Sequence, residues 1–223
     1  MLSLRSVTLD LDGTLLDTLD DLTAGCNGML ADLGLPTYSR EAVSGFVGDG
    51  MHTLVERCLT GAGIAVAEDV MLVALDGFRR HYAAANGQGA QPYPGVLDGL
   101  ESLRQAGLAL AVVTNKPAQF TEPLLQATGL AGFFHVVLSG DSLPHKKPHP
   151  LPILHACTLL GSAASQNLHV GDSKNDVLAA RAAGCPVFCV PYGYRGGASV
   201  DTLSGDALVS GLPEVAQRVR LAG

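Results

Sequence analysis

Two aspartates near the N-terminus, Asp10 and Asp12, have the spacing of a catalytic carboxylate pair. They stand at the end of a predicted strand at 4–11, and Gly13 follows directly, where the chain can turn. Residues two apart on a strand point to the same side, so both carboxylates leave the strand together. Such a pair suits Mg²⁺, and it also suits a division of labour in which Asp10 attacks phosphorus and Asp12 moves a proton. The same residues also fit an ordinary exit from a strand into a turn.

Asp172 and Asp176 form a second acidic pair far along the chain. Asp172 follows a predicted strand at 168–170, and Asp176 comes one helical turn later, so both side chains can point at one cation. The alternative for Asp172 is a helix-capping role.

Two polar segments lie between the acidic pairs. A predicted buried strand ends in Thr114 and Asn115, directly before a helix that Pro117 opens. A helix N-terminus offers free N–H groups, which together with these side chains would hold phosphate oxygens, although a simple helix cap fits equally well. In the segment 146–150 (KKPHP), a lysine beside prolines has little freedom and can aim its ammonium at a phosphate or at Asp10. A paired-lysine surface loop is the alternative.

Alternating strands and helices position these residues. Short apolar runs predict strands at 108–114, 136–138, 168–170 and 187–190, with helices predicted at 96–105, 118–128, 151–160 and 176–183. The alternation predicts a doubly wound, Rossmann-like α/β core with a parallel sheet. Ligands of such sheets lie at the carboxyl ends of the strands, which is where all four polar segments fall.

The chain between Asp12 and the strand at 108 is far longer than the dozen or so residues that a crossover needs. Helical periodicity divides it into segments at 19–33, 50–59 and 67–85. We therefore predict a small all-α cap inserted after the first strand. The predicted domains are an α/β catalytic core at 1–17 and 91–223 and a helical cap at 18–90.

The composition excludes some classes of protein. Hydrophobic residues make up 47% of the 223 residues and charged residues 16%, so the chain can bury a substantial core and is not disordered. The net charge is −7 and the basic residues are scattered, which argues against a nucleic-acid partner. An acidic protein that binds an anion needs a metal ion or a few well-placed cations beside it.

Three features predict a cytoplasmic protein with no membrane partner. The five cysteines have no CxxC spacing, and their odd number fits free thiols in a reducing compartment. The apolar run at 1–9 is too short for a signal peptide, and no segment approaches the ~20 unbroken apolar residues of a membrane span. No feature of the sequence predicts an oligomeric state.

An acidic pair, a hydroxyl, a lysine and a second acidic pair thus follow one another, each after a predicted strand. In this order the sequence resembles the haloacid dehalogenase superfamily, whose four motifs match between residues 10 and 176. The resemblance implies that Asp10 is the nucleophile forming an aspartyl-phosphate and that Asp12 is the general acid/base. It implies phosphate binding by Thr114 and Asn115 and charge neutralisation by Lys147. The implied cofactor is Mg²⁺, held by Asp10, the backbone carbonyl of Asp12 and Asp172, with Asp176 acting through water or by supporting the direct ligands.

Particular residues narrow the activity within this superfamily. True dehalogenases attack carbon and lack the second acid, which is Asp12 here. The phosphonate-cleaving branch needs a lysine from the cap, and no lysine occurs before Lys116. Mutases usually place a basic shuttle on the cap, for which only arginines and histidines such as Arg57 and His52 are available. Hydrolysis of a small phosphomonoester remains.

Finer similarities point to one group. The segments DLDGTLLDT at 10–18, FVGDG at 46–50, GDSLPHKKPHP at 140–150 and VGDSKND at 170–176 resemble the phosphoglycolate phosphatase group. The resemblance implies 2-phosphoglycolate as substrate, with a sugar phosphate or another small phosphomonoester as the alternative. Gly48, Gly50 and His52 of the cap are then expected to contact substrate, although the two glycines also fit a plain turn.

Two non-enzymatic alternatives share parts of this pattern. Phospho-accepting receiver domains also combine acids, a threonine, a lysine and Mg²⁺, but they are about half this length, accept phosphate on a middle strand and have no cap. A phosphate-sensing relative without activity would have lost part of the catalytic set. All the motif residues are present here, which favours an enzyme.

Overall fold

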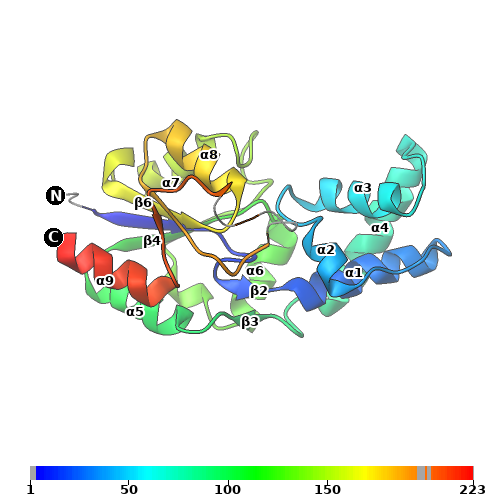
Figure 1. Cartoon of the computed structure of the whole chain (residues 1–223), viewed down its shortest axis with the longest axis horizontal. Coiled ribbons are helices and arrows are strands. Elements are labelled where there is room, and N and C mark those ends of the chain that lie inside the picture. The colour runs from blue at the N-terminus through cyan, green and yellow to red at the C-terminus, as the bar shows by residue number, and fades with distance from the viewer. Residues whose placement is uncertain (1–3, 195–198, 200–201, 223) are drawn as a thin grey trace.

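The computed structural model of the chain describes residues 4–194, 199 and 202–222. It consists of an α/β core and a group of helices at one end of that core (Figure 1). The described residues begin at 4 and end at 222 on the side of the core that faces away from these helices.

Six parallel strands form the sheet of the core, in the order β5-β4-β1-β6-β7-β8. They are β1 (Ser6–Leu9), β4 (Ala109–Val113), β5 (Val136–Leu138), β6 (Asn167–Gly171), β7 (Val187–Cys189) and β8 (Ala207–Leu208). The chain builds outward from β1 in both directions, so the order of the strands reverses beside β1. Leu9, the last residue of β1, pairs with Val112 on one side and Val170 on the other, which brings the ends of three strands together. The predicted doubly wound α/β fold is confirmed.

Helices cover both faces of the sheet. Those of the core are α5 (Val96–Gln105), α6 (Ala118–Ala127), α7 (Leu151–Leu159), α8 (Lys174–Ala183) and α9 (Leu212–Ala222). Leu110 and Val112 of β4 belong to the apolar cluster that includes α5, α6 and α9, whereas Ala111 and Val113 belong to the cluster that includes α7 and α8. Alternate side chains of β4 are therefore buried on opposite faces, which explains its unbroken apolar sequence.

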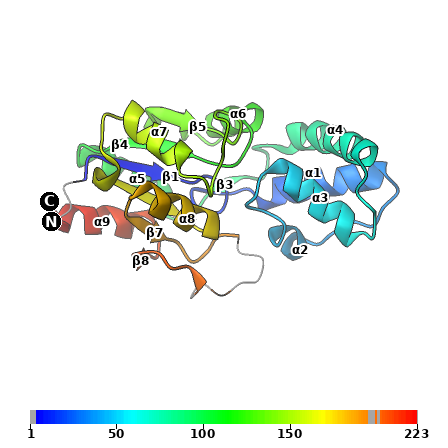
Figure 2. The same cartoon turned by 90° about the horizontal axis from the view of Figure 1, so that it is seen from above.

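The remaining helices lie together beyond one end of the sheet (Figures 1 and 2). They are α1 (Leu19–Asp32), α2 (Arg40–Ser44), α3 (Met51–Gly61) and α4 (Glu68–Ala85), and we call them the cap. The cap has its own apolar cluster, built around buried side chains such as Met29, Leu59 and Phe78. Two short antiparallel strands, β2 (Leu16–Asp17) and β3 (Gln91–Pro92), pair where the chain leaves and re-enters the core. The domain boundaries at residues 18 and 90 stay a prediction.

Two further expectations concern the compartment. All five cysteines are buried and free, as predicted. Within the described ranges, none of the helices combines the length and the apolar character that crossing a bilayer requires.

Candidate active site

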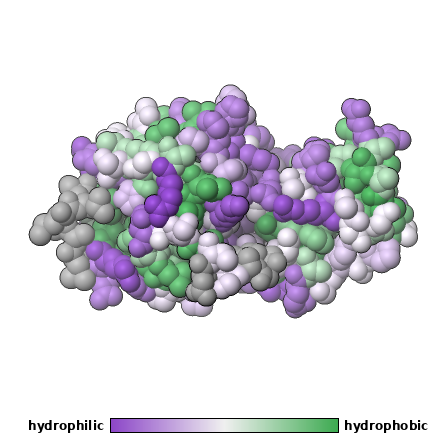
Figure 3. All heavy atoms as spheres, turned by 45° about the horizontal axis from the view of Figure 1, so that its top comes forward, coloured by the Kyte–Doolittle hydropathy of each residue, from purple (hydrophilic) through white to green (hydrophobic). Residues whose placement is uncertain are grey.

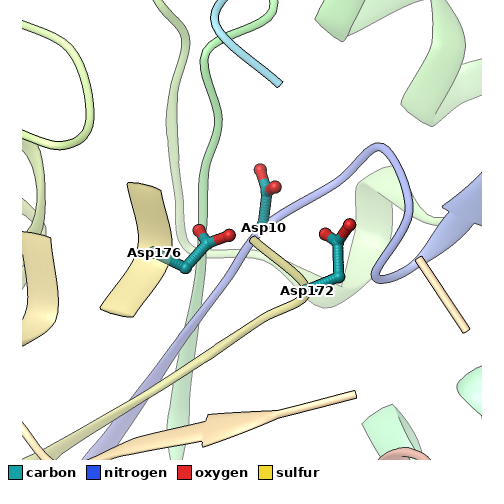
Figure 4. A group of neighbouring side chains, drawn as sticks. All are labelled: Asp10, Asp172 and Asp176. Carbon is teal, nitrogen blue, oxygen red and sulfur yellow. The ribbon is translucent and has the colours of Figure 1, made fainter. Parts of the chain in front are cut away.

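Three buried carboxylates meet at the carboxyl ends of the central strands. Asp10 follows β1, Asp172 follows β6, and Asp176 lies in the first turn of α8. Each offers an oxygen within 4.8 Å of the others, and the three side chains point toward a common space (Figure 4). The sequence predicts each of Asp10 and Asp172 at the end of a strand, and the parallel pairing of β1 with β6 brings the two strand ends together.

The electrostatics of this cluster favour a bound cation. Burial raises the pKa of Asp10 to about 6, although Lys147 acts in the opposite direction. Burial, with repulsion from Asp10 and Asp176, also raises the pKa of Asp172. The cluster therefore holds negative charge poorly by itself. Buried carboxylate oxygens close together are the donor set that hard divalent cations prefer, so these residues fit a metal ion.

Asp176 differs from the other two acids because protein groups already occupy both of its oxygens. Oδ1 accepts hydrogen bonds from Lys147 Nζ at 2.6 Å and His169 Nε2 at 3.0 Å. Oδ2 accepts from the Ser173 backbone N–H at 3.1 Å and from its hydroxyl at 2.5 Å. Burial opposes a charge on Asp176, but Lys147 and His169 outweigh it and lower the pKa of this carboxyl. These contacts favour the indirect role expected for Asp176, through water or in support of the direct ligands, and that role stays a prediction.

Lys147 lies between two of the acids, behind the surface of the site. Its Nζ is 2.8 Å from Asp10 Oδ1 and 2.6 Å from Asp176 Oδ1, and its side chain is 2% exposed. Burial opposes a charge on Lys147, but the two carboxylates outweigh it and raise the pKa of its ammonium. A charged lysine at this position can neutralise part of the Asp10 carboxylate. The catalytic role of Lys147 stays a prediction.

Asp172 is held by neutral donors only. Oδ1 accepts from the Thr14 hydroxyl at 2.8 Å, and Oδ2 accepts from the Tyr194 backbone N–H at 2.7 Å. Gly13 passes close to this carboxylate with φ +83°, and a Cβ at that position would lie 2.6 Å from Asp172 Oδ2. The turn after Asp12 therefore requires glycine twice, for its left-handed backbone and for the close approach.

Asp12 faces a lysine of its own. Lys116 Nζ lies 2.9 Å and 3.1 Å from the two Asp12 oxygens, and the Thr18 hydroxyl donates to Oδ1 at 2.7 Å. Lys116 also donates to the Tyr82 hydroxyl of α4 at 2.5 Å. The sequence offered no reason to assign a role to Lys116 or Tyr82.

Thr114 and Asn115 lie where the phosphate-binding prediction requires, at the end of β4 and in the lining of the site. The Asn115 side-chain amide, however, donates to the backbone oxygens of Gly48 at 3.0 Å and Lys147 at 2.9 Å. One of these hydrogen bonds joins the cap loop to the core, and the other joins two loops of the core. A phosphate contact by Asn115 stays a prediction, and its amide can take part only if one of these bonds breaks.

The cap loop at 46–50 closes over the site from the other side. The Asn175 side chain of α8 donates to Asp49 Oδ1 at 2.7 Å and to the backbone oxygen of Gly48 at 3.2 Å. Lys146 Nζ donates to the backbone oxygen of Asp49 at 2.6 Å. Gly48 and Gly50 line the cleft beneath this loop, whereas His52 is exposed and is absent from the lining. The substrate contact expected for His52 stays a prediction that this geometry does not support.

A cleft runs from the carboxylates between the cap and the core. In Figure 3 the molecule narrows at this junction, and hydrophilic residues lie on both sides of it. Asp10, Asp12 and Asp172 form the polar end of the cleft. The cap contributes mainly apolar side chains to the lining, and Phe120 of α6 adds an apolar ring from the core; those of the cap are Leu22, Val47, Met51, Leu54 and Phe78.

Behind the site, a buried histidine supports the acids. His169 of β6 is fully buried, with Nε2 3.0 Å from Asp176 Oδ1 and Nδ1 2.9 Å from the Thr8 hydroxyl. Burial lowers the pKa of His169, which favours the neutral ring. Polar residues on strands that are otherwise apolar are the sequence signal that could have indicated this support.

Comparisons with known proteins agree with this geometry. A model of the haloacid dehalogenase-like hydrolase family matches residues 7–190. The chain is 46% identical over 222 residues to the phosphoglycolate phosphatase of Thiobacillus denitrificans, covering 99% of this chain and 98% of that protein. It is 47% identical over 221 residues to the plasmid phosphoglycolate phosphatase of Cupriavidus necator, covering 97% and 95%.

A solved structure shows the same architecture. The crystal structure of a predicted phosphoglycolate phosphatase from Haemophilus somnus 129PT superposes with a TM-score of 0.91 at 34% identity, and all of both chains is covered. The predicted superfamily and the predicted class of enzyme are therefore confirmed. The chain belongs to the haloacid dehalogenase-like hydrolase family and is a phosphomonoester hydrolase similar to the phosphoglycolate phosphatases.

Proposed function

We propose that the protein hydrolyses 2-phosphoglycolate to glycolate and phosphate through a phosphorylated Asp10. The observation that carries this proposal is the position of Asp10, a buried carboxylate that lines the cleft with Lys147 2.8 Å away and two further acids beside it. The names of the Thiobacillus and Cupriavidus relatives support the choice of substrate.

In the first step, an Asp10 oxygen attacks phosphorus and the bond between phosphorus and the ester oxygen breaks. Asp12 gives its proton to the departing oxygen, so the alcohol leaves neutral. In the second step, water attacks the phosphorus of the acyl phosphate while Asp12 takes its proton. Phosphate leaves, and Asp10 is again a carboxylate.

Lys147 and the backbone at the end of β4 provide charge stabilisation for the phosphoryl group. A dianionic phosphate would be repelled by Asp10, and a buried ammonium at 2.8 Å reduces that repulsion. Thr114, at the end of β4 in the lining of the cleft, is the hydroxyl that we expect to contact the phosphate oxygens.

We propose Mg²⁺ as the cofactor, with Asp10, Asp172 and the backbone carbonyl of Asp12 as its protein ligands. The ion supplies positive charge that lets the phosphate dianion approach the acids. Asp176 supports it indirectly, because its oxygens are already bound to Lys147 and Ser173.

We also propose that the enzyme acts in the cytoplasm on a free small molecule. Five buried, free thiols support a reducing compartment.

The experiment is phosphate release measured with Mg²⁺ on p-nitrophenyl phosphate, 2-phosphoglycolate and a panel of sugar phosphates. We expect the highest kcat/KM with 2-phosphoglycolate, and no turnover of any ester by Asp10→Asn with an unchanged circular dichroism spectrum. Full activity of that variant would refute the nucleophile. A sugar phosphate at the head of the panel would refute only the substrate.

A further inference from the structure

One basic side chain in the cleft has no part in the phosphoryl chemistry described above. Lys116 is the only lysine or arginine among the described residues that line the cleft. Lys147 neutralises Asp10 from behind, whereas Lys116 faces the cleft beside Asp12. A cation in this position is available to a part of the substrate other than its phosphate.

Lys116 is charged and fixed in place. Its side chain is 3% exposed, and its Nζ lies 2.9 Å and 3.1 Å from the Asp12 oxygens and 4.9 Å from the centre of the Tyr82 ring. The orientation of Lys116 therefore does not depend on a ligand.

Tyr82 adds a second donor at the same point. Its hydroxyl accepts a hydrogen bond from Lys116, and within the described part of the chain no hydrogen bond donated by this hydroxyl occurs. Burial raises the pKa of Tyr82, so the hydroxyl keeps its proton. The ring is fixed by Phe78 and Phe120, with centroids 5.2 Å and 4.7 Å away. An ammonium and an unused O–H thus converge at one side of the cleft.

The rest of the cleft limits what can bind there. The cap contributes leucine, valine, methionine and phenylalanine side chains to the lining, and these offer no partners to the hydroxyl groups of a sugar that lies against them; burying such groups without partners is costly. A short substrate with a single anionic group meets both the apolar wall and the two donors. The chemistry of the cleft therefore favours a carboxylate over a polyol.

The position of Asp12 relates the ester oxygen of the substrate to Lys116. In the proposed function, Asp12 protonates the ester oxygen, and Lys116 contacts the same carboxylate of Asp12. A group on the carbon that carries the ester oxygen is therefore brought next to Lys116. In 2-phosphoglycolate that group is the carboxylate.

We propose that Lys116 and Tyr82 form the receptor for the substrate carboxylate, and that they select short phosphomonoesters with a carboxylate on the carbon bearing the ester oxygen. This inference rests on the proposed function. Lys116 belongs to the core and Tyr82 to α4 of the cap, so the receptor is complete only when cap and core are in contact.

The test compares 2-phosphoglycolate with ethyl phosphate, which has a methyl group in place of the carboxylate. The measured quantity is the ratio of the two kcat/KM values, which cancels any loss of general acid/base function at Asp12. We expect Tyr82→Phe to lower this ratio roughly tenfold and Lys116→Met roughly 100-fold, the range for losing a hydrogen bond to a charged group. Tyr38→Phe, which removes another cap hydroxyl, and Lys174→Met, which removes an exposed lysine, are the matched controls and should leave the ratio unchanged.

The outcomes separate this inference from the proposed function. Equal losses on both esters in Tyr82→Phe and Lys116→Met would overturn the receptor. Such losses would show that the two residues act only by positioning Asp12. A wild-type enzyme that hydrolyses both esters equally well would overturn it too, while the phosphatase stands.

Binding provides a readout that needs no turnover. We expect 3-phosphonopropionate with Mg²⁺ to raise the melting temperature of the wild type more than propylphosphonate does. We expect Tyr82→Phe to reduce this difference and Lys116→Met to abolish it. The same shift with both compounds in the wild type would overturn the receptor even if no ester were hydrolysed.

Discussion

Asp21 joins the cap to the segment by which the chain returns to the core. It lies in the first turn of α1 and is 3% exposed. Its Oδ2 accepts the backbone N–H of Gly87 and its Oδ1 that of Gly89, both at 2.7 Å. The change Asp21→Asn keeps the size of the side chain but replaces one acceptor by an NH₂ group that faces an N–H donor.

The cost of this change follows from the contacts. One hydrogen bond to a charged acceptor is lost, worth roughly 1.5–3 kcal/mol, and the other becomes a weaker neutral bond. The negative charge near the N-terminus of α1 is lost as well, worth roughly 0.3–1 kcal/mol. We expect a total of about 3 kcal/mol, which for a chain of this size lowers the melting temperature by roughly 6–12 °C.

The assay is thermal unfolding followed by circular dichroism, with Asp76→Asn as the matched control. Asp76 is 70% exposed and pairs with Arg80 on the surface of α4, so its loss should cost about 0.5 kcal/mol or less. We also expect faster proteolysis between residues 86 and 90 in Asp21→Asn. Equal melting temperatures for the two variants would refute the assigned role of Asp21.

The other predictions concern the metal and the cap loop. Chelation of metal ions by EDTA should abolish phosphate release, and added Mg²⁺ should restore it. Mg²⁺ at a hundred times its dissociation constant should stabilise the folded protein by about 2.7 kcal/mol. An unchanged melting temperature on addition of Mg²⁺ would count against the metal site. Asn175→Ala removes contacts to Gly48 and Asp49, so we expect KM to rise several-fold for every ester with little change in kcat. A loss confined to kcat would show that Asn175 acts on the chemistry instead.

The core of the site could be predicted because its geometry follows from the topology. In a parallel sheet the carboxyl ends of neighbouring strands meet, so polar residues after successive apolar runs are brought together. Asp10 and Asp172 needed only this rule and the order of the motifs, whereas the choice of Lys147 rested on the resemblance to the superfamily. The long cap helices were predictable from a different signal, because α1, α3 and α4 each bury an apolar face whose residues recur at helical spacing.

The parts of the site and of the fold that the sequence did not predict depend on packing between segments far apart in the chain. Tyr82 reaches Lys116 only because α4 lies against Phe120 of the core, and no local pattern marks that contact. His169 stands out as a polar residue on an apolar strand, but its partner cannot be read from the strand, because α8 brings Asp176 against it. Elements such as α2 and β8 are too short for a periodic signal, and the contacts of their neighbours determine them.

The three acids that line the cleft are not equivalent, and their partners separate their roles. Asp10 contacts Lys147 and Asp12 contacts Lys116, so each of these carboxylates is paired with its own ammonium. Asp172, by contrast, receives only a hydroxyl and a backbone N–H. Because burial raises its pKa and no lysine or arginine pairs with it in the described ranges, its charge lacks a cation of the protein. A bound divalent ion would supply that charge, so the carboxylate without a lysine is the one whose role depends most on the metal.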